Sequence, residues 1–308
     1  MAVEAEHSFP LQGEGALFRE RGFMRGFMTS LALPRRLYII FWLLLFPALP
    51  VAAHPFDPFA EEKQAELQRV AEYMRQGNTQ EALIQTDQAI AKFPKHGPFY
   101  TLKAQIFLKV GQTRNARVAI EQALDLTPDY ALSYWIRGLI HQQQNNPSAA
   151  IGDFNRVLEL DDQNHMLMAQ AVGSRGMALT DLGRHTEALG DLNRALEVRP
   201  GAVAERQFRA IAYLALGRLK QAQSDIAVLL VHEPDNALPH RLQGELWLKR
   251  EEFKRALVSL DRALTINPKD AQAYRLRANA HQQLGQAAKA HADRVKTCEL
   301  GDTTTCGK

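Results

Sequence analysis

The sequence lacks the short motifs that mark the common enzyme and metal sites. It contains no GxxxxGK[ST], HExxH, GxSxG or CxxC pattern and no EF-hand loop, so the usual signals of nucleotide, zinc, acyl-transfer, redox and calcium chemistry are missing. None of its ten histidines has a second histidine four residues away, the spacing that places two ligands on one helix face. We therefore predict no catalytic, cofactor-binding or metal-binding residues and expect a non-enzymatic protein.

The sequence also lacks a large excess of either positive or negative charge. The chain has 37 Lys and Arg against 34 Asp and Glu, a net charge of +3, and the two signs alternate along it. No basic stripe with interleaved aromatic residues occurs, so nucleic acid is not expected as a partner. Hydrophobic residues make up 46% of the chain, which is too apolar for a disordered protein.

Only two cysteines occur, Cys298 and Cys306, and they flank the segment ELGDTTT. An even number of cysteines in an exported protein favours a disulfide. This bond would hold the threonine-rich tail against the preceding helix. Two free thiols or a metal site are the alternatives.

The N-terminal part, residues 1–53, resembles an export signal. The segment RRLYIIFWLLLFPALPVAA, residues 35–53, places Arg35 and Arg36 before a short apolar run and ends in small residues. This order is typical of a secretory signal peptide cleaved after Ala53, and the run is short for a membrane span. An uncleaved membrane anchor is the alternative, and the chain could start at Met1, Met24 or Met28. Cleavage would leave His54 at the N-terminus, where a histidine can help to chelate copper.

The rest of the chain repeats with a period of 34 residues. Glycines in predicted turns, from Gly77 to Gly111 and from Gly183 to Gly217, are 34 residues apart. Pro94 and Pro128 have the same spacing, as do Pro200, Pro234 and Pro268. Apolar residues at helical spacing lie on both sides of each turn, which predicts two antiparallel helices in each unit.

Small residues in these units carry a resemblance to a known family. Alanine is found at position 20 of every unit, as Ala82, Ala116, Ala150, Ala188, Ala222, Ala256 and Ala290. Alanine or glycine holds position 8 in six of the seven units, for example Ala104 and Gly138. This pattern is similar to that of the tetratricopeptide repeat family. The resemblance implies an all-α, right-handed superhelical solenoid.

Seven repeats are predicted between a leader, 54–62, and a short tail, 305–308. The repeats are 63–96, 97–130, 131–164, 169–202, 203–236, 237–270 and 271–304. The insert His165–Met168 is expected to lengthen one helix by a turn, since four residues make about one turn. The polar last helix is expected to cap the stack.

In this family the first helices line a concave groove, and the resemblance places positions 2, 5, 9, 12 and 13 in it. The groove residues predicted in this way are Trp135, Leu139, Met177, Gln207, Ile211, Arg241, Glu245, Arg275 and Asn279. The middle of the row is apolar, and whether it is open for binding or buried by neighbouring helices is left undecided. Chaperone-binding members hold a terminal carboxylate with Lys and Asn at positions 5 and 9. Only Arg275 and Asn279 come near that pattern, so no such clamp is predicted.

Arginine at position 7 and aspartate at position 23 occur together in four repeats. The pairs are Arg137 with Asp153, Arg175 with Asp191, Arg209 with Asp225, and Arg277 with Asp293. The two positions are equally far from the turn, so antiparallel helices should bring the charges into contact. In the repeat 237–270 both charges are replaced, by Gln243 and Ser259. This joint loss indicates a structural ion pair rather than a ligand site.

These features predict a scaffold or adaptor of the cell envelope that binds a protein or extended peptide in its groove and helps to assemble a complex there. Its location would be periplasmic or secreted. One alternative is a membrane-tethered assembly factor that keeps its N-terminal helix and contacts the membrane only through it. Another is a periplasmic metal-handling protein that uses His54.

Overall fold

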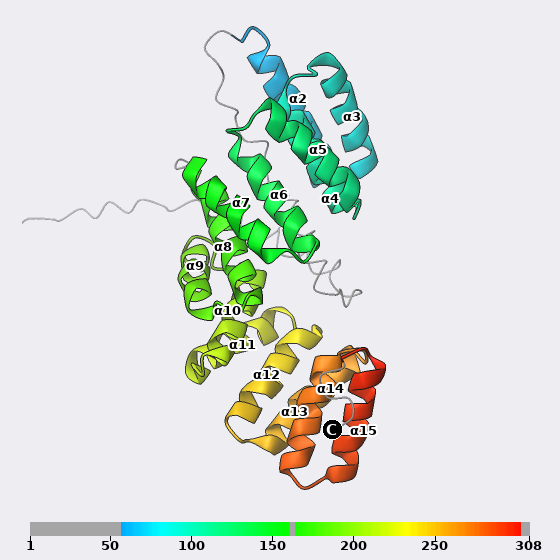
Figure 1. The fold of residues 1–308 in the computed structure, drawn as a ribbon, viewed down its shortest axis with the longest axis vertical. Coiled ribbons are helices and arrows are strands. Elements are labelled where there is room, and N and C mark those ends of the chain that lie inside the picture. The colour runs from blue at the N-terminus through cyan, green and yellow to red at the C-terminus, as the bar shows by residue number, and fades with distance from the viewer. Residues whose placement is uncertain (1–56, 161–163, 303–308) are drawn as a thin grey trace, which may run out of the picture. The chain divides into compact units, whose positions relative to one another are not determined.

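A computed structural model describes residues 57–160 and 164–302. This part of the chain is all-α and contains no strand, as Figure 1 shows, which confirms the predicted fold class. Its fourteen helices are α2 Ala60–Arg75, α3 Thr79–Lys92, α4 Gly97–Lys109, α5 Thr113–Leu126, α6 Ala131–Gln143, α7 Pro147–Leu160, α8 His165–Asp181, α9 His185–Val198, α10 Val203–Ala215, α11 Leu219–His232, α12 Ala237–Lys249, α13 Phe253–Ile266, α14 Ala271–Gln283 and α15 Ala287–Glu299.

Consecutive helices pair in each repeat, the even-numbered helix first and the odd-numbered helix second. Each helix contacts its partner and the next helix along the chain, and the first helices of neighbouring repeats also contact one another. A first helix is therefore packed on three sides. Its remaining side is open to a partner.

The turn inside every repeat has one residue with a positive φ angle. Five of these residues are glycines with φ between 69° and 77°, namely Gly77, Gly111, Gly183, Gly217 and Gly285. Asn145 and Glu251 hold the same place in the other two repeats, with φ of 59° and 60°. Because glycine has no β-carbon, it adopts this conformation without the steric cost that other residues meet.

The two helices of a repeat pack closely where position 8 faces position 24. A β-carbon on Gly138 would lie 2.5 Å from the ring of Phe154, and one on Gly244 would lie 2.5 Å from Cγ of Leu260. Where position 24 is isoleucine, as in Ile120, position 8 is alanine, as in Ala104. Leucine or phenylalanine at position 24 thus stands opposite glycine and isoleucine opposite alanine, and the close packing of these pairs depends on this match of sizes.

The proline near the end of a repeat ties that repeat to the next one. The carbonyl oxygens of Pro94 and Pro128 accept hydrogen bonds from the hydroxyls of Tyr100 and Tyr134, at 3.0 and 2.9 Å. His240 Nε2 lies 2.9 Å from the carbonyl oxygen of Pro234. These contacts fix the angle at which the chain enters the next first helix.

The first helix begins earlier than predicted. α2 starts at Ala60, so it overlaps the predicted leader, 54–62, by three residues. Lys63 Nζ donates a 2.7 Å hydrogen bond to Asp57, and the ring of Phe59 lies 5.8 Å from that of Phe93. These two contacts hold the residues before the repeat against it and allow the helix to extend toward the N-terminus.

The insert lengthens a helix, as the sequence indicates. α8 has 17 residues, four more than α6 or α10. The four added residues, His165–Met168, form its first turn. Leu167 of this turn is buried in the core, whereas Met166 is half exposed.

The close approach at position 8 predicts a clear difference between two alanine substitutions in one repeat. Gly138→Ala should lower the free energy of unfolding by about 1–3 kcal/mol, because its β-carbon must displace the ring of Phe154. A β-carbon on Gly152 in α7 would meet no atom within 4 Å. Gly152→Ala should therefore raise the free energy by about 0.5–1 kcal/mol through helix propensity. Urea unfolding followed by circular dichroism measures both, and equal effects would contradict the packing argument.

Candidate functional site

The four Arg–Asp pairs are in contact in the structure. The shortest nitrogen–oxygen distance is 2.7 Å in each of Arg137–Asp153, Arg175–Asp191, Arg209–Asp225 and Arg277–Asp293. In each pair both carboxylate oxygens accept hydrogen bonds from the guanidinium. The hydrogen bond to the aspartate raises the pKa of each arginine above its ordinary value. Such a two-point ion pair neutralises both charges and also fixes the position of one helix relative to the other.

Each of these arginines also reaches the preceding repeat. Arg209 donates a 2.9 Å hydrogen bond to Asn193, and Arg277 donates a 2.7 Å bond to Asp261. The corresponding contacts are Arg137 with Glu121, Arg175 with Asn155, and Lys103 with Asp87. All five acceptors lie at position 25, a contact that sequence reasoning missed. The recurring acceptor at that position is the signal that would have revealed it.

The repeat 237–270 keeps this geometry without charge. Ser259 Oγ donates a 3.0 Å hydrogen bond to Oε1 of Gln243, at the positions of Asp and Arg elsewhere. Position 25 of the preceding repeat is Ala227, which cannot accept a side-chain hydrogen bond. All three members of the arrangement are thus replaced together, and the joint between these two repeats has no side-chain link of this kind.

The ion pairs predict that removing one charged partner lowers the free energy of unfolding more than removing one partner of the neutral Ser259–Gln243 hydrogen bond. Asp191→Ala should lower the free energy of unfolding by about 2 kcal/mol, because Arg175 loses both of its carboxylate bonds. Ser259→Ala removes the neutral equivalent and should cost about 0.5–1 kcal/mol. Adding Arg175→Leu to Asp191→Ala should recover part of the loss, since no unpaired charge is then left half-buried. Urea unfolding of the three variants and the wild-type protein tests this, and equal costs for the two alanines would refute it.

Two of the predicted groove residues are not on a binding surface. Trp135 and Leu139 are only 2% and 3% exposed and belong to a core cluster with side chains of α4, α5, α7 and α8. The open question about the apolar row is thus answered by burial at these two positions. The reason is that neighbouring first helices pack side by side and large apolar side chains fill the space between them.

The other groove residues at position 5 are occupied by contacts within the protein. Gln207 Nε2 donates a 2.8 Å hydrogen bond to Glu233, whose pKa is raised by burial. Arg241 Nε lies 3.0 Å from Oδ2 of Asp270. Both Gln207 and Arg241 are buried, so the prediction that they meet a partner is corrected.

Position 5 of the repeat 169–202 is also filled. It is Gly173, and a β-carbon there would lie 2.8 Å from Oε1 of Glu205. Glu205 is buried beside Arg199, whose Nη2 lies 3.3 Å from that oxygen. Burial raises the pKa of Glu205 and lowers that of Arg199. The carboxylate therefore takes the space that a side chain at position 5 would fill.

Four predicted groove residues form a row that remains accessible. Met177, Ile211 and Glu245 are partly exposed and Asn279 is exposed, and all four lie at position 9 of successive first helices, α8, α10, α12 and α14. We call them the position-9 row. Arg275, one turn before Asn279, is 44% exposed and lies 3.7 Å from Asp302. The row changes from apolar to polar toward the C-terminus.

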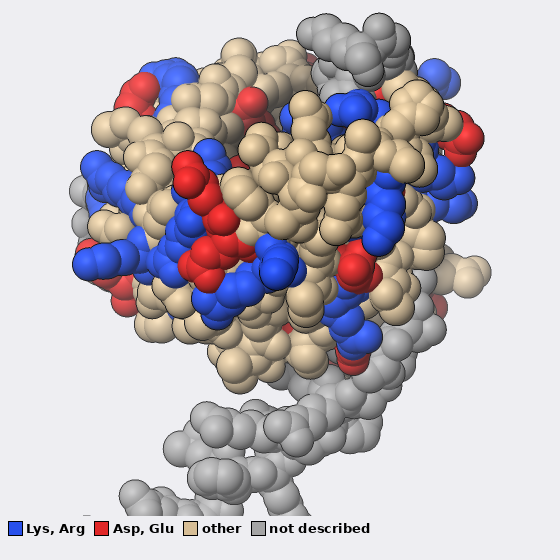
Figure 2. Space-filling view, turned by 90° about the horizontal axis from the view of Figure 1, so that it is seen from below, with Lys and Arg blue, Asp and Glu red and all other residues tan. Residues whose placement is uncertain are grey.

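Charges on the surface at the C-terminal end are mixed. Figure 2 shows Lys and Arg interleaved with Asp and Glu on the face seen from below. Areas of uncharged surface lie between them. Glu245, Arg275 and Asn279 belong to the C-terminal repeats. A partner bound here would meet single charges of both signs rather than a broad field of one sign.

Several predicted features lie outside the described residues or find no counterpart in them. His54, Cys306 and the apolar run 37–49 fall outside, so the copper site, the disulfide with Cys298 and the export signal stay predictions. Within 57–160 and 164–302, no helix has both the length and the apolar character needed to cross a membrane. The same residues contain no cluster of three or more potential metal ligands.

The repeat geometry agrees with comparisons to known proteins. The family model for the tetratricopeptide repeat matches residues 101–165 and 209–271. These two segments belong to the tetratricopeptide repeat family. A tetratricopeptide repeat protein of Parabacteroides merdae shares its fold, with 18% identity, a TM-score of 0.55, and coverage of 78% of this chain and 94% of that one. PilW, a type IV pilus biogenesis factor, also has 18% identity and a TM-score of 0.55, covering 65% and 91%. These likenesses confirm the superhelical repeat fold.

Relatives by sequence include two larger proteins. The Hsp70-Hsp90 organizing protein of Triticum aestivum is 25% identical over 190 residues, 60% of this chain and 32% of the relative. The human DnaJ homolog subfamily C member 7 is 25% identical over 219 residues, 66% and 44%. The chain thus spans less than half the length of these relatives. Tetratricopeptide repeats bind other proteins through the concave surfaces of their stacks.

Proposed function

We propose that this tetratricopeptide repeat protein is a non-enzymatic adaptor that binds a protein or an extended peptide along the position-9 row. The observation that carries the proposal is the contrast between positions 5 and 9. Apart from the exposed Arg275, the position-5 residues are buried within the protein, whereas Met177, Ile211, Glu245 and Asn279 lie on four successive first helices and keep exposed surface. A partner laid across these helices would meet all four.

The row suits an extended peptide segment that changes from apolar to polar along its length. Met177 and Ile211 offer apolar surface, and burying an aliphatic side chain against them is worth about 1.5–3 kcal/mol. Glu245, Asn279 and Arg275 offer charged and polar groups that can pair with a partner's backbone or side chains. A partner with apolar residues at one end and polar residues at the other fits this order.

We further propose that the protein acts in the cell envelope and helps to assemble a complex there. The support is the signal-like segment 35–53, which a periplasmic or secreted protein needs and a cytosolic adaptor does not. Retention of that segment would make the protein a membrane-tethered assembly factor with the same binding surface.

The row predicts where a partner can be cross-linked. A photo-reactive amino acid in place of Asn279 should cross-link the partner in native cells, because this side chain lies on the row and is exposed. The same amino acid in place of Val258, which is 71% exposed on second helix α13, is the matched control and should give no product of that size. Ile211→Ala should weaken binding of the cross-linked partner by at least about fivefold if the row contributes a hot spot. Equal products from both sites would refute the row as the binding surface.

Export predicts the N-terminus of the mature protein. N-terminal sequencing of protein isolated from the envelope fraction should begin at His54, because the small residues Val51 and Ala53 precede this bond. An intact segment 35–53 in that protein would instead support the membrane-tethered form. Recovery in the cytosol with the segment uncleaved would contradict both.

A further inference from the structure

A pocket lies at the start of the lengthened helix α8. Four extra residues add about 6 Å to a helix, so the start of α8 projects beyond the end of α9, a 14-residue helix like the second helices before it. The pocket lies at this step, between the two helices. Its lining comes from the first two turns of α8 and the last turns of α9, and consists of His165, Met168, Ala169, Val172, Arg194 and Val198.

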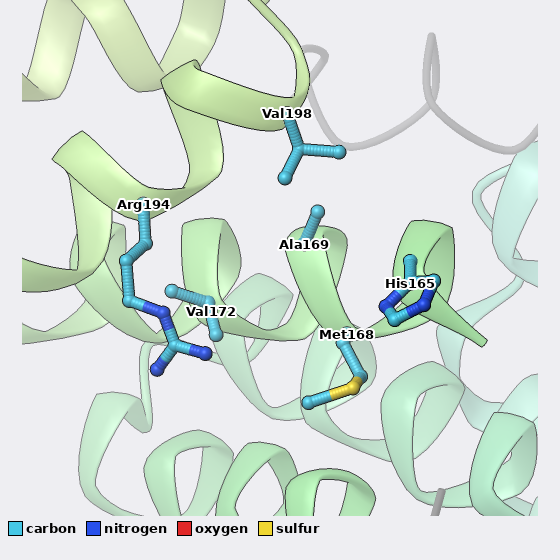
Figure 3. Close-up of a pocket in the computed structure, with 6 residues that line it drawn as sticks. All are labelled: His165, Met168, Ala169, Val172, Arg194 and Val198. Atoms are coloured by element: carbon cyan, nitrogen blue, oxygen red, sulfur yellow. The ribbon is translucent and has the colours of Figure 1, made fainter. Parts of the chain in front are cut away.

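The pocket has an apolar floor and two polar sides. Figure 3 shows Val198 and Ala169 pointing toward each other, with Met168 and Val172 beneath them. Arg194 and His165 stand on opposite sides of these apolar groups (Figure 3). Val198 keeps 51% of its surface exposed, although it lines the pocket. An apolar group that entered here would cover that surface.

Arg194 has no partner within the described protein. No hydrogen bond or ion pair joins it to residues 57–160 or 164–302, whereas the four arginines paired with aspartate at position 23 each bind two side chains. No aspartate or glutamate is among the described residues that line the pocket. Among the described residues, the pocket therefore presents an exposed positive charge beside apolar surface, and no described acidic side chain lines it.

The pocket is separate from the position-9 row. The row consists of side chains from first helices only, while the pocket is lined by both helices of one repeat. Val172 and Met177 belong to the same helix but lie five residues apart, which places them on different sides of it. A ligand in the pocket therefore need not touch the row.

We propose that this pocket is a second docking site for a partner protein, which inserts an aliphatic side chain next to an aspartate or glutamate. The hollow measures about 100 Å³, smaller than the cavity of about 150 Å³ that accepts a benzene ring. This size suits a leucine or valine side chain. The adjacent carboxylate pairs with Arg194, and His165 can donate a hydrogen bond from the other side. The site goes beyond the proposed adaptor function and does not depend on the row.

A defined peptide tests the pocket on the full-length protein. The protein is labelled with ¹³C in its methionine methyl groups, and the Met168 signal is assigned with Met168→Leu. The probe is the blocked tetrapeptide acetyl-Gly-Leu-Asp-Gly-amide, with acetyl-Gly-Leu-Asn-Gly-amide as its uncharged match. The Met168 signal should shift with a dissociation constant of about 1 mM, as expected for one buried side chain and one ion pair.

The charge requirement is tested by matched variants. Arg194→Gln should weaken binding about tenfold, the effect of one charge-assisted hydrogen bond, and the asparagine peptide should bind the wild-type protein equally weakly. Arg117→Gln removes an exposed arginine of α5 that likewise has no partner in the described residues, and should leave the affinity unchanged. Circular dichroism checks that both variants stay folded.

Four results would overturn the proposal. They are no shift of Met168 up to about 10 mM peptide, equal affinity for both peptides, equal binding by Arg194→Gln, or a Met168 signal that depends on protein concentration, which would indicate a second copy of the chain. A shift of Met177 without one of Met168 would place the peptide on the row, and so support the proposed function while refuting the pocket. Failure of the cross-link at Asn279 would leave this test unaffected.

Discussion

The close crossing of the two helices in each repeat is the constraint on which the rest of the structure depends. Residues sixteen apart meet across the turn, and two neighbouring contacts are built on that spacing. One is the fit of glycine or alanine at position 8 against the side chain at position 24, as in Gly138 with Phe154. The other is the ion pair between positions 7 and 23, which lies beside it. The first contact sets how near the helices come, and the second fixes their alignment along the axis.

The same arginine connects one repeat to the next, so alignment is transmitted along the stack. Arg277 holds Asp293 in its own repeat and Asp261 in the one before. Each repeat in a solenoid contacts only its neighbours, so stability depends on such interfaces one at a time. Where Ala227, Gln243 and Ser259 replace the charged set, a neutral hydrogen bond joins the two helices of the repeat 237–270, and this type of side-chain link to the preceding repeat is missing. The repeats 203–236 and 237–270 are therefore not held together by the contact between positions 7 and 25 that joins other neighbouring repeats.

The sequence predicted the contacts made within a repeat better than those made between repeats. The spacing of Arg175 and Asp191 around Gly183 was enough to pair them, because two antiparallel helices bring together residues that are equally far from the turn between them. Whether Trp135 faces a partner or a neighbouring helix depends on how first helices pack against each other, and that depends on side chains of three repeats at once. Position 5 is used internally for the same reason, since its contacts, such as those with Glu205 and Asp270, come from the following repeat or the loop before it, whose course the periodicity does not describe.

Departures from the period are therefore more informative about function than the period itself. Residues that recur in every unit, such as the position-20 alanines, are explained by the crossing of the helices and leave nothing for a partner. The other repeats make their helix contacts without an insert like His165–Met168. The extra turn of this insert nevertheless buries Leu167 and contributes to a pocket beside Arg194. The position-9 row likewise changes residue type from one repeat to the next, from Met177 to Asn279, whereas the framework positions around it do not. In a chain built by repetition, the surfaces that differ between units are the ones free to match a partner.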